Sequence, residues 1–409
     1  MFDFFRKGRR PAPEPARQAE LGPPASDPWA SLASLCAPVD PRALCRLLAR
    51  AGFTPAGYRA ANADLVAALP ADDAASLRHF LEHGIHEARE FPVELQWDVL
   101  EEIRALPFEH ANTGRQLTRS LISAYFWPNR LAQATAKQAL SKIRDYGGRP
   151  FLLIGDSHSM SYRRPAWRGD AWLLPLHVNC IAGSARGLSN PASRSGYGRR
   201  IRELWLEMAN LEDAPGVPVL WKFGQVDTEF VHTFRRVSKN LVAFDVAEFA
   251  QFSQRSVEGY AEFLASVVPA SLRRESHVCS IFAPALSDEA HAQGYVSGHI
   301  TSLESDLDAE AMLTAVRKLE IPDLATRTRM HRTYNALLAE QVRPLGFEFL
   351  DDFSALLGND GTLDERFRQH AGGFDHHVNF QASASVLEPI LWDILTPRTL
   401  AQPSNLDKG

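Results

Sequence analysis

The chain has 409 residues, of which 45% are apolar and 23% are charged, and its formal net charge is −5. A chain of this length exceeds the size at which one hydrophobic core usually stops growing, so the sequence predicts one large domain and a smaller one. The small net charge creates no field that would attract nucleic acid or an anionic membrane over the whole surface, which argues against nucleic-acid binding.

The four cysteines, Cys36, Cys45, Cys180 and Cys279, have no C-x-x-C spacing. This predicts buried thiols in a reducing compartment rather than a metal or redox site. No segment has the roughly 18 uninterrupted apolar residues of a membrane span, and residues 1–10 lack the apolar run of a secretory signal. We therefore expect a cytoplasmic protein without a transmembrane segment.

In chain order, the composition predicts a disordered basic and proline-rich tail (1–28), a small helical module (29–110), connecting helices (111–147) broken at Trp127-Pro128, an α/β domain (148–400) and a short disordered tail (401–409). In the first tail, Phe2, Phe4 and Phe5 lie beside four basic residues. Contact with a membrane surface or a partner is therefore an alternative to plain disorder.

The helical module has a clear start signal, because Asp40 is a typical N-cap residue and Pro41 suits the first helical position. A second helix is expected at 75–83, ending at Gly84. The region resembles a small helical module that recurs in bacterial surface-glycan proteins, often beside glycosyltransferases. The residues that carry this resemblance are Tyr58, Asn62, Asp64, His79, Phe80, Gly84, Glu87 and Arg89. The alternative is a packing module in which the apolar residues only form a core.

From about residue 150, apolar strand-like segments alternate with helix-like ones. Strands are expected at 151–154, 219–223, 241–244, 277–282 and 347–350, and helices at 200–208, 256–268, 327–342 and 382–394. This alternation indicates a mainly parallel sheet covered on both faces. In such sheets ligands bind at the carboxyl ends of the strands, which is where most polar clusters of this sequence fall.

The first polar cluster, Gly155-Asp156-Ser157-His158, follows the first expected strand. A glycine turn into a helix places Ser157 at a helix N-terminus, where free N–H groups favour a developing oxyanion. A serine hydroxyl needs a base, and this base has to come from elsewhere because the His158 side chain is expected to point away from the hydroxyl. The alternative is that Asp156 or Ser157 only caps the helix.

The second cluster precedes the last expected helix and contains Asp375, His376, His377 and Asn379. A histidine at the top of the sheet with a carboxylate two residues away is suited to general-base chemistry. The alternatives are a metal site, for which no convincing third ligand is seen, and a set of cap and turn residues. We expect neither a metal nor a cofactor.

Two further clusters could supply substrate or oxyanion contacts. Gly224, Gln225 and Asp227 end the strand at 219–223, and the glycine-rich loop 182–191 contains Gly183 and Gly187. A polar turn and a flexible loop are the respective alternatives.

In their chain order these four clusters resemble the SGNH/GDSL hydrolase superfamily, over about residues 150–396. The resemblance implies a flavodoxin-like three-layer α/β sandwich and serine-dependent acyl transfer. It implies Ser157 as the nucleophile, His377 as the base with Asp375 as its partner, and Gly183, with Gly187 in reserve, as an oxyanion donor.

The sequence departs from the family pattern at two positions. Gly224 and Asp227 match the third block, but Val226 replaces its asparagine, and Asp375 is one residue closer to the histidine than the family spacing. Losing one side-chain oxyanion donor slows acyl transfer by about 10²–10³-fold unless another group such as Gln225 substitutes.

Three functions follow as hypotheses. The first is a serine-dependent esterase or O-acyltransferase acting on a carbohydrate or surface glycan, with glycosyltransferases of the same pathway as expected partners. Trp167, Trp172 and Trp221 would suit sugar stacking or belong to the core. The second is a catalytically altered SGNH-like domain that serves glycan assembly by binding or by another group transfer. The third is a metal-dependent hydrolase that uses Asp156, His158, Asp375 and His377.

Overall fold

The computed structural model describes residues 27, 29–85, 89, 91–110, 112–126, 142–209, 217–296, 300, 309–369 and 373–396. Three predictions fall outside these residues: the two tails (except Asp27, which is described), Glu87 of the helical module, and the helix break at Trp127-Pro128. None of the described helices is both long enough and apolar enough to cross a bilayer. All four cysteines are free, and Cys36, Cys180 and Cys279 are buried.

The first part of the chain is helical, as predicted. Its helices are α1 (Ala33–Cys36), α2 (Pro41–Arg50), α3 (Pro55–Ala61), α4 (Ala63–Ala68), α5 (Asp73–His79), the π-helix η2 (Phe80–Gly84), α6 (Trp97–Arg104) and α7 (Thr113–Phe126). The Asp40 carboxylate caps α2 by accepting from the N–H groups of Arg42 and Ala43, with Pro41 at the first helical position. The predicted start signal is therefore confirmed.

Residues that carry the module resemblance contact one another. The Tyr58 hydroxyl lies 3.0 Å from His79 Nδ1, and the Asn62 amide donates to the Tyr58 carbonyl. A side chain at Gly84 would meet the Tyr58 hydroxyl at 2.4 Å. These contacts are made within the helical region itself, so they account for the residue pattern by packing.

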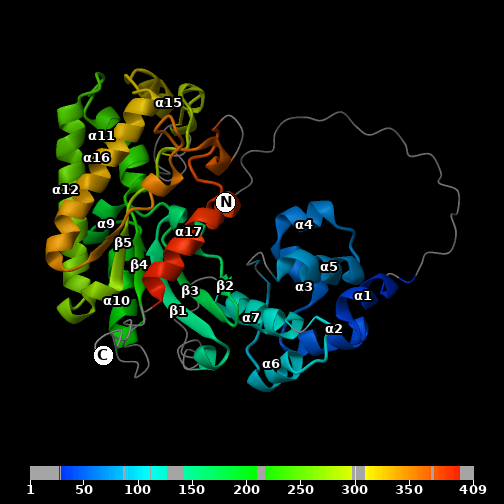
Figure 1. Cartoon of the computed structure of the whole chain (residues 1–409). Coiled ribbons are helices and arrows are strands. Elements are labelled where there is room, and N and C mark those ends of the chain that lie inside the picture. Colours follow the sequence, from blue (N-terminus) through cyan, green and yellow to red (C-terminus); the bar gives the residue numbers. More distant parts are fainter. Residues whose placement is uncertain are drawn as a thin grey trace, which may run out of the picture.

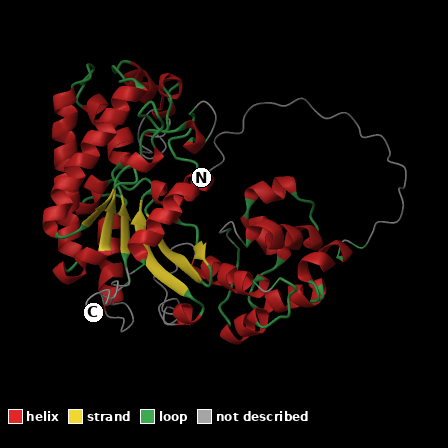
Figure 2. Ribbon diagram, in the orientation of Figure 1, coloured by secondary structure: helices red, strands yellow, loops and turns green. Residues whose placement is uncertain are grey.

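The second part contains a six-stranded sheet (Figure 2). Its strands are β1 (Gly148–Gly155), β2 (Ala166–Arg168), β3 (Ala171–Asn179), β4 (Val219–Lys222), β5 (Ser276–Cys279) and β6 (Glu348–Leu350), in the order β2-β3-β1-β4-β5-β6. Only the β2–β3 pair is antiparallel. Without β2 this is the flavodoxin-like order 2-1-3-4-5, in which the chain reverses direction across the sheet between β1 and β4.

Successive side chains of β1 enter different cores, as the pleat of a strand requires. Leu152 and Ile154 belong to one apolar cluster, whereas Phe151 and Leu153 belong to another. The first cluster is covered by α9 (Ala185–Ser189), α10 (Tyr197–Ala209), α12 (Val246–Val267) and α16 (Leu324–Val342), and the second by α17 (Phe380–Leu395). Figure 1 shows the resulting layers, with α17 crossing one face of the strands. The predicted three-layer α/β sandwich is confirmed.

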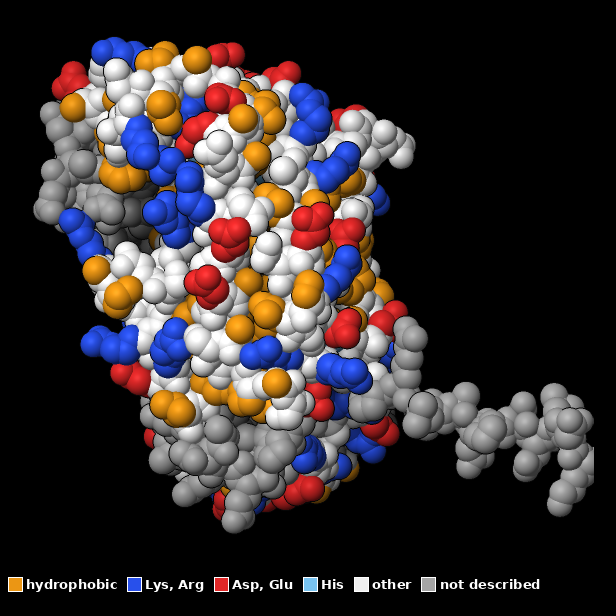
Figure 3. Space-filling model, turned by 90° about the vertical axis from the view of Figure 1, so that its left-hand side faces the viewer, with side chains coloured by type: hydrophobic (Ala, Val, Ile, Leu, Met, Phe, Trp, Pro, Cys, Tyr) orange, Lys and Arg blue, Asp and Glu red, His pale blue; other side chains and the backbone are white. Residues whose placement is uncertain are grey.

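The remaining helices, α11 (His232–Ser238), α13 (Asp288–Ala292) and α15 (Ala309–Arg317), lie beyond the carboxyl end of the sheet. On the outer face of the α12–α16 layer, side chains of both charges are interspersed with apolar ones (Figure 3).

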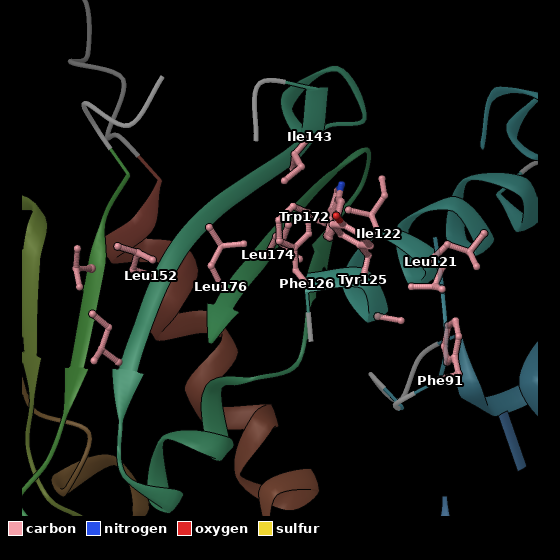
Figure 4. Packing of buried hydrophobic residues seen from close by; sticks show 14 of the residues in the cluster. Phe91, Leu121, Ile122, Tyr125, Phe126, Ile143, Leu152, Trp172, Leu174 and Leu176 are labelled. Atoms are coloured by element: carbon pink, nitrogen blue, oxygen red, sulfur yellow. The ribbon is translucent and has the colours of Figure 1, made fainter. Parts of the chain in front are cut away.

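The helical region packs against the sheet through a contact between α7 and β3. Ile122, Tyr125 and Phe126 of α7 lie near Trp172 and Leu174 of β3 (Figure 4). One apolar cluster therefore runs from the helical region into the sheet. The division into separate domains stays a prediction.

One predicted strand is a loop, and one strand of the sheet was not predicted. Residues 241–244 form a loop, in which the Val242 carbonyl accepts from Arg236 and from the Glu320 N–H. Conversely, residues 171–179 were not expected as a strand. They contain Pro175, which is unusual inside a sheet, yet Pro175 pairs with Phe151 of β1.

A buried polar network crosses the second core. Asp352, after β6, accepts from the ammonium of Lys222 (2.6 Å) and from the hydroxyls of Tyr162 and Ser280. Lys222 and Asp352 are at most 1% exposed. The charges are therefore compensated without water.

We expect Lys222→Met to lower the free energy of unfolding by about 3–5 kcal/mol, because it leaves a buried carboxylate without its cation. The measurement is urea unfolding followed by circular dichroism. Arg366→Met is the matched control, since it breaks an ion pair with Asp364 in which the arginine is 76% exposed, and it should not change the midpoint measurably. Equal effects of the two changes would contradict the assigned role of the network.

Candidate active site

Ser157 lies directly after the bend that follows β1. It is the first residue of the 3₁₀-helix η4 (Ser157–Tyr162), and Asp156 caps this helix by accepting from the His158 N–H. The first N–H groups of a helix have no acceptor within it, so the Ser157 N–H is placed to bind an anion. Gly155 is needed at the bend, because a Cβ there would meet the Lys222 carbonyl oxygen at 2.5 Å.

The loop before α17 brings a histidine to this serine. His377 Nε2 lies 2.8 Å from Ser157 Oγ, and His377 Nδ1 lies 2.9 Å from Asp375 Oδ1. A carboxylate only accepts, so it holds the proton on Nδ1 and leaves Nε2 to accept the serine proton. The structure thus brings together the three residues predicted for catalysis.

The short spacing between Asp375 and His377 does not prevent this geometry. Asp375 Oδ1 accepts from both the backbone N–H of His377 and its Nδ1, each at 2.9 Å. Asp156 and His158 repeat the arrangement with the same two distances. An aspartate followed two residues later by histidine therefore forms a closed local turn that orients the ring.

His158 lies behind His377, as part of a group of three imidazoles. Its ring centroid is 4.8 Å from that of His377 and 5.2 Å from that of His376. It forms no hydrogen bond with the serine, as expected. Burial lowers the pKa of His158, and the adjacent Asp156 carboxylate opposes this effect. The Tyr295 hydroxyl lies 2.8 Å from His376 Nδ1.

Most of the predicted oxyanion donors are engaged elsewhere. The Gly183 N–H donates to the Cys180 carbonyl, and the Gly187 N–H donates to Ser184. These two assignments are corrected, because both groups close turns within their own loop. Gly183 is instead a close-packing position, where a Cβ would meet the Cys180 carbonyl oxygen at 2.8 Å.

Gln225 does not replace the missing asparagine. Its amide oxygen accepts from the Phe282 N–H, and its amide nitrogen donates to Glu229 and to the Phe282 carbonyl. Val226, at the asparagine position, is buried in an apolar cluster. The prediction that Gln225 contacts the substrate is therefore corrected, because its amide already joins β4 to the chain after β5.

Asp227 has a structural role. Its carboxylate accepts from the N–H groups of Ala185 and Arg186 at the start of α9 and from the Ser256 hydroxyl. Burial raises its pKa to about 6. It thereby joins the loop after β4 to the glycine-rich loop, away from the Ser157 hydroxyl.

Gly224 differs from Gly183 and Gly187, because its N–H forms no hydrogen bond within the described part of the chain and could donate to an oxyanion. Gly155 pairs with Lys222, so Gly224 follows β4 at the level at which Ser157 follows β1. Its φ of +116° and a contact of 2.6 Å between an added Cβ and the Tyr334 ring both require glycine. Gly224 stays a candidate oxyanion donor.

The sequence did not indicate Glu229, Tyr295 or Tyr334. Glu229 belongs to the π-helix η5 (Asp227–Val231), and irregular helices of this kind occur often at functional sites. Its Oε1 accepts from Gln225, whereas its buried Oε2 has no partner within the described residues. Burial raises the pKa of Glu229 to about 8, and the nearby carboxylates of Asp156 and Asp375 add to this.

The tryptophans considered for sugar stacking belong to the core. Trp172 and Trp221 are fully buried, and Trp167 stacks on Trp172 with ring centroids 5.5 Å apart.

The comparisons with known proteins add little to this geometry. No family model and no curated protein matches the chain. A solved structure, described as a candidate platelet activating factor from Streptococcus pneumonia, shares 15% sequence identity and covers 63% of this chain and 90% of its own, with a TM-score of 0.33. Likeness at this level assigns no activity, so the function has to be inferred from the site.

We expect the stability of Glu229→Gln, measured relative to the wild type, to increase progressively as the pH rises from about 4.5 to about 8. The wild-type glutamate has its pKa raised from 4.5 to about 8 by folding, so the unfolded chain releases its proton first and wild-type stability falls across this interval. The amide has no proton to release. Unfolding midpoints at pH 5 and pH 9 measure the effect, and a difference between variant and wild type that is the same at both pH values would contradict it.

Proposed function

We propose that this chain is an SGNH-like serine esterase or O-acyltransferase that acts on a carbohydrate through an acyl-enzyme. The observation that carries the proposal is the chain of contacts from Ser157 Oγ to His377 Nε2 and from His377 Nδ1 to Asp375. The serine and the histidine are 220 positions apart in the sequence, which excludes local sequence proximity as the cause of these contacts. The serine also lies at the β1–β4 switch point, where open α/β sheets bind ligands.

The residues divide the chemistry as follows. His377 Nε2 takes the hydroxyl proton of Ser157 while Ser157 Oγ attacks the acyl carbon. The Ser157 N–H then stabilises the resulting oxyanion. His377 then returns the proton to the departing alcohol, which leaves the acyl group on the serine. Water or a sugar hydroxyl attacks this ester, with His377 again as the base. Water completes hydrolysis, and a sugar completes transfer.

The three side chains of the site are partly exposed to solvent. The side chains of His377 and Asp375 are 20% and 25% exposed, and Ser157 is half-buried. The carbohydrate acceptor and the glycosyltransferase partners are supported by the resemblance of the helical region to a module of surface-glycan proteins. The tryptophans do not support a carbohydrate acceptor, because they belong to the core and are not placed to stack on a sugar.

A fluorophosphonate probe should label the wild-type chain at one residue, and Ser157→Ala should abolish the labelling. Asp375→Asn should slow the labelling by up to about 10⁴-fold, because the histidine would lose its preferred tautomer. Ser195→Ala, at an exposed serine, is the matched control. Labelling is read by intact-mass spectrometry, and labelling that persists in Ser157→Ala would refute the proposal.

A second function is favoured by the shortage of oxyanion donors. The N–H of Gly183 and the side-chain amide of Gln225 are engaged in other hydrogen bonds, and Val226 replaces the asparagine of the family pattern. An SGNH-like domain with altered chemistry would then serve glycan assembly by binding or by another group transfer. A folded wild-type chain that the probe does not label would support this function over the first. An acetylated sugar incubated with the chain and a second sugar, followed by mass spectrometry, separates hydrolysis from transfer.

A further inference from the structure

Three imidazoles converge beside the catalytic serine. One ring nitrogen of each of His158, His376 and His377 lies within 4.8 Å of the other two. His158 and His376 are almost completely buried, whereas His377 reaches the surface. The proposed acyl transfer uses only His377, so the two buried rings have no role in it.

Each ring has its Nδ1 engaged by an oxygen behind it. Asp156 Oδ1 lies 2.9 Å from Nδ1 of His158, Asp375 Oδ1 lies 2.9 Å from Nδ1 of His377, and the Tyr295 hydroxyl lies 2.8 Å from Nδ1 of His376. The Nε2 atom is the other ring nitrogen in each case. Metal-binding histidines have this arrangement, in which an outer oxygen fixes the ring and raises its basicity.

The local charge suits a divalent ion. The carboxylates of Asp156 and Asp375 both lie directly behind ligand rings and together carry two negative charges. Neutral imidazole is a ligand of zinc, copper, nickel and iron rather than of magnesium or calcium. Two nitrogens that bind one tetrahedral zinc ion lie about 3.4 Å apart, because the bonds are about 2.0–2.1 Å long. Ring nitrogens that are now up to 4.8 Å apart would therefore have to approach each other by up to about 1.4 Å around such an ion.

We propose that His158, His376 and His377 form a site for a divalent transition metal, with Zn²⁺ as the preferred ion, and that this metal competes with the Ser157 hydroxyl for His377 Nε2. Bound metal would remove the base and switch the serine off. Inhibition rests on the proposed serine chemistry, whereas metal binding does not.

Metal binding is tested by calorimetric titration of the tag-free full chain with Zn²⁺ and by the visible absorption of bound Co²⁺. We expect one ion per chain, with the intense bands of a four-coordinate cobalt site. His377→Gln, at the least buried ring, and His158→Gln should both lose binding, whereas His83→Gln, at an exposed histidine outside the group, should retain it. Thermal unfolding checks that the variants are folded. Absent binding in the wild type, or equal binding in folded His377→Gln, would overturn the site.

Competition is tested by fluorophosphonate labelling of the wild type with increasing Zn²⁺. At a zinc concentration ten times the Kd, labelling should fall about tenfold and recover with a chelator. Labelling that remains in His376→Gln should be insensitive to zinc. Labelling of a zinc-loaded wild type at the full rate would overturn the sharing of His377.

The failures of the two proposals are distinguishable, because Ser157→Ala should bind Zn²⁺ as the wild type does. A wild type that binds zinc but is never labelled, even with chelator, would refute the serine chemistry and keep the metal site.

Discussion

The buried carboxylate of Asp352 determines where Ser157 can lie. It accepts from Tyr162 at the end of the helix that begins with Ser157, from Lys222 of β4 and from Ser280 after β5. A buried charge without all its partners would cost several kcal/mol, so the helix that carries Ser157 cannot leave the strands without disrupting the core. The serine is thus held at the sheet by contacts made five residues away from it.

The base reaches the serine through a second constraint, the packing of α17 on the same face of the sheet. Leu387 and Leu391 of α17 share a core with Phe151 and Leu153 of β1. The loop that precedes α17 is therefore brought to the end of β1, and its short turn from Asp375 to His377 aims the ring at the hydroxyl. Side-chain packing sets the position of the base, and a local turn sets its direction.

The same turn occurs twice, and this is what makes the site unusual. Asp156 orients His158 as Asp375 orients His377, so two carboxylate–imidazole pairs from opposite ends of the domain face each other, with His376 beside both rings. One pair is sufficient for a serine base. In the metal site that we propose, the second pair supplies a ligand, and the shared His377 ring would make metal binding and serine chemistry mutually exclusive.

The sequence by itself determined the α/β alternation and the helix that begins at Asp40, because these depend on local periodicity and capping. Through the family resemblance it also predicted Ser157, Asp375 and His377 as the candidate catalytic residues. It did not determine β3, which contains a proline. β2 pairs with β3 only as far as Leu173, so Pro175 lies where β1 is the neighbouring strand of β3 and the other edge is not paired with β2. Nor did it show that Gly183 and Gln225 are engaged, or that Glu229 is buried beside the site. Hydrogen-bond partners and burial depend on segments far apart in the chain, and only the tertiary structure brings those segments together.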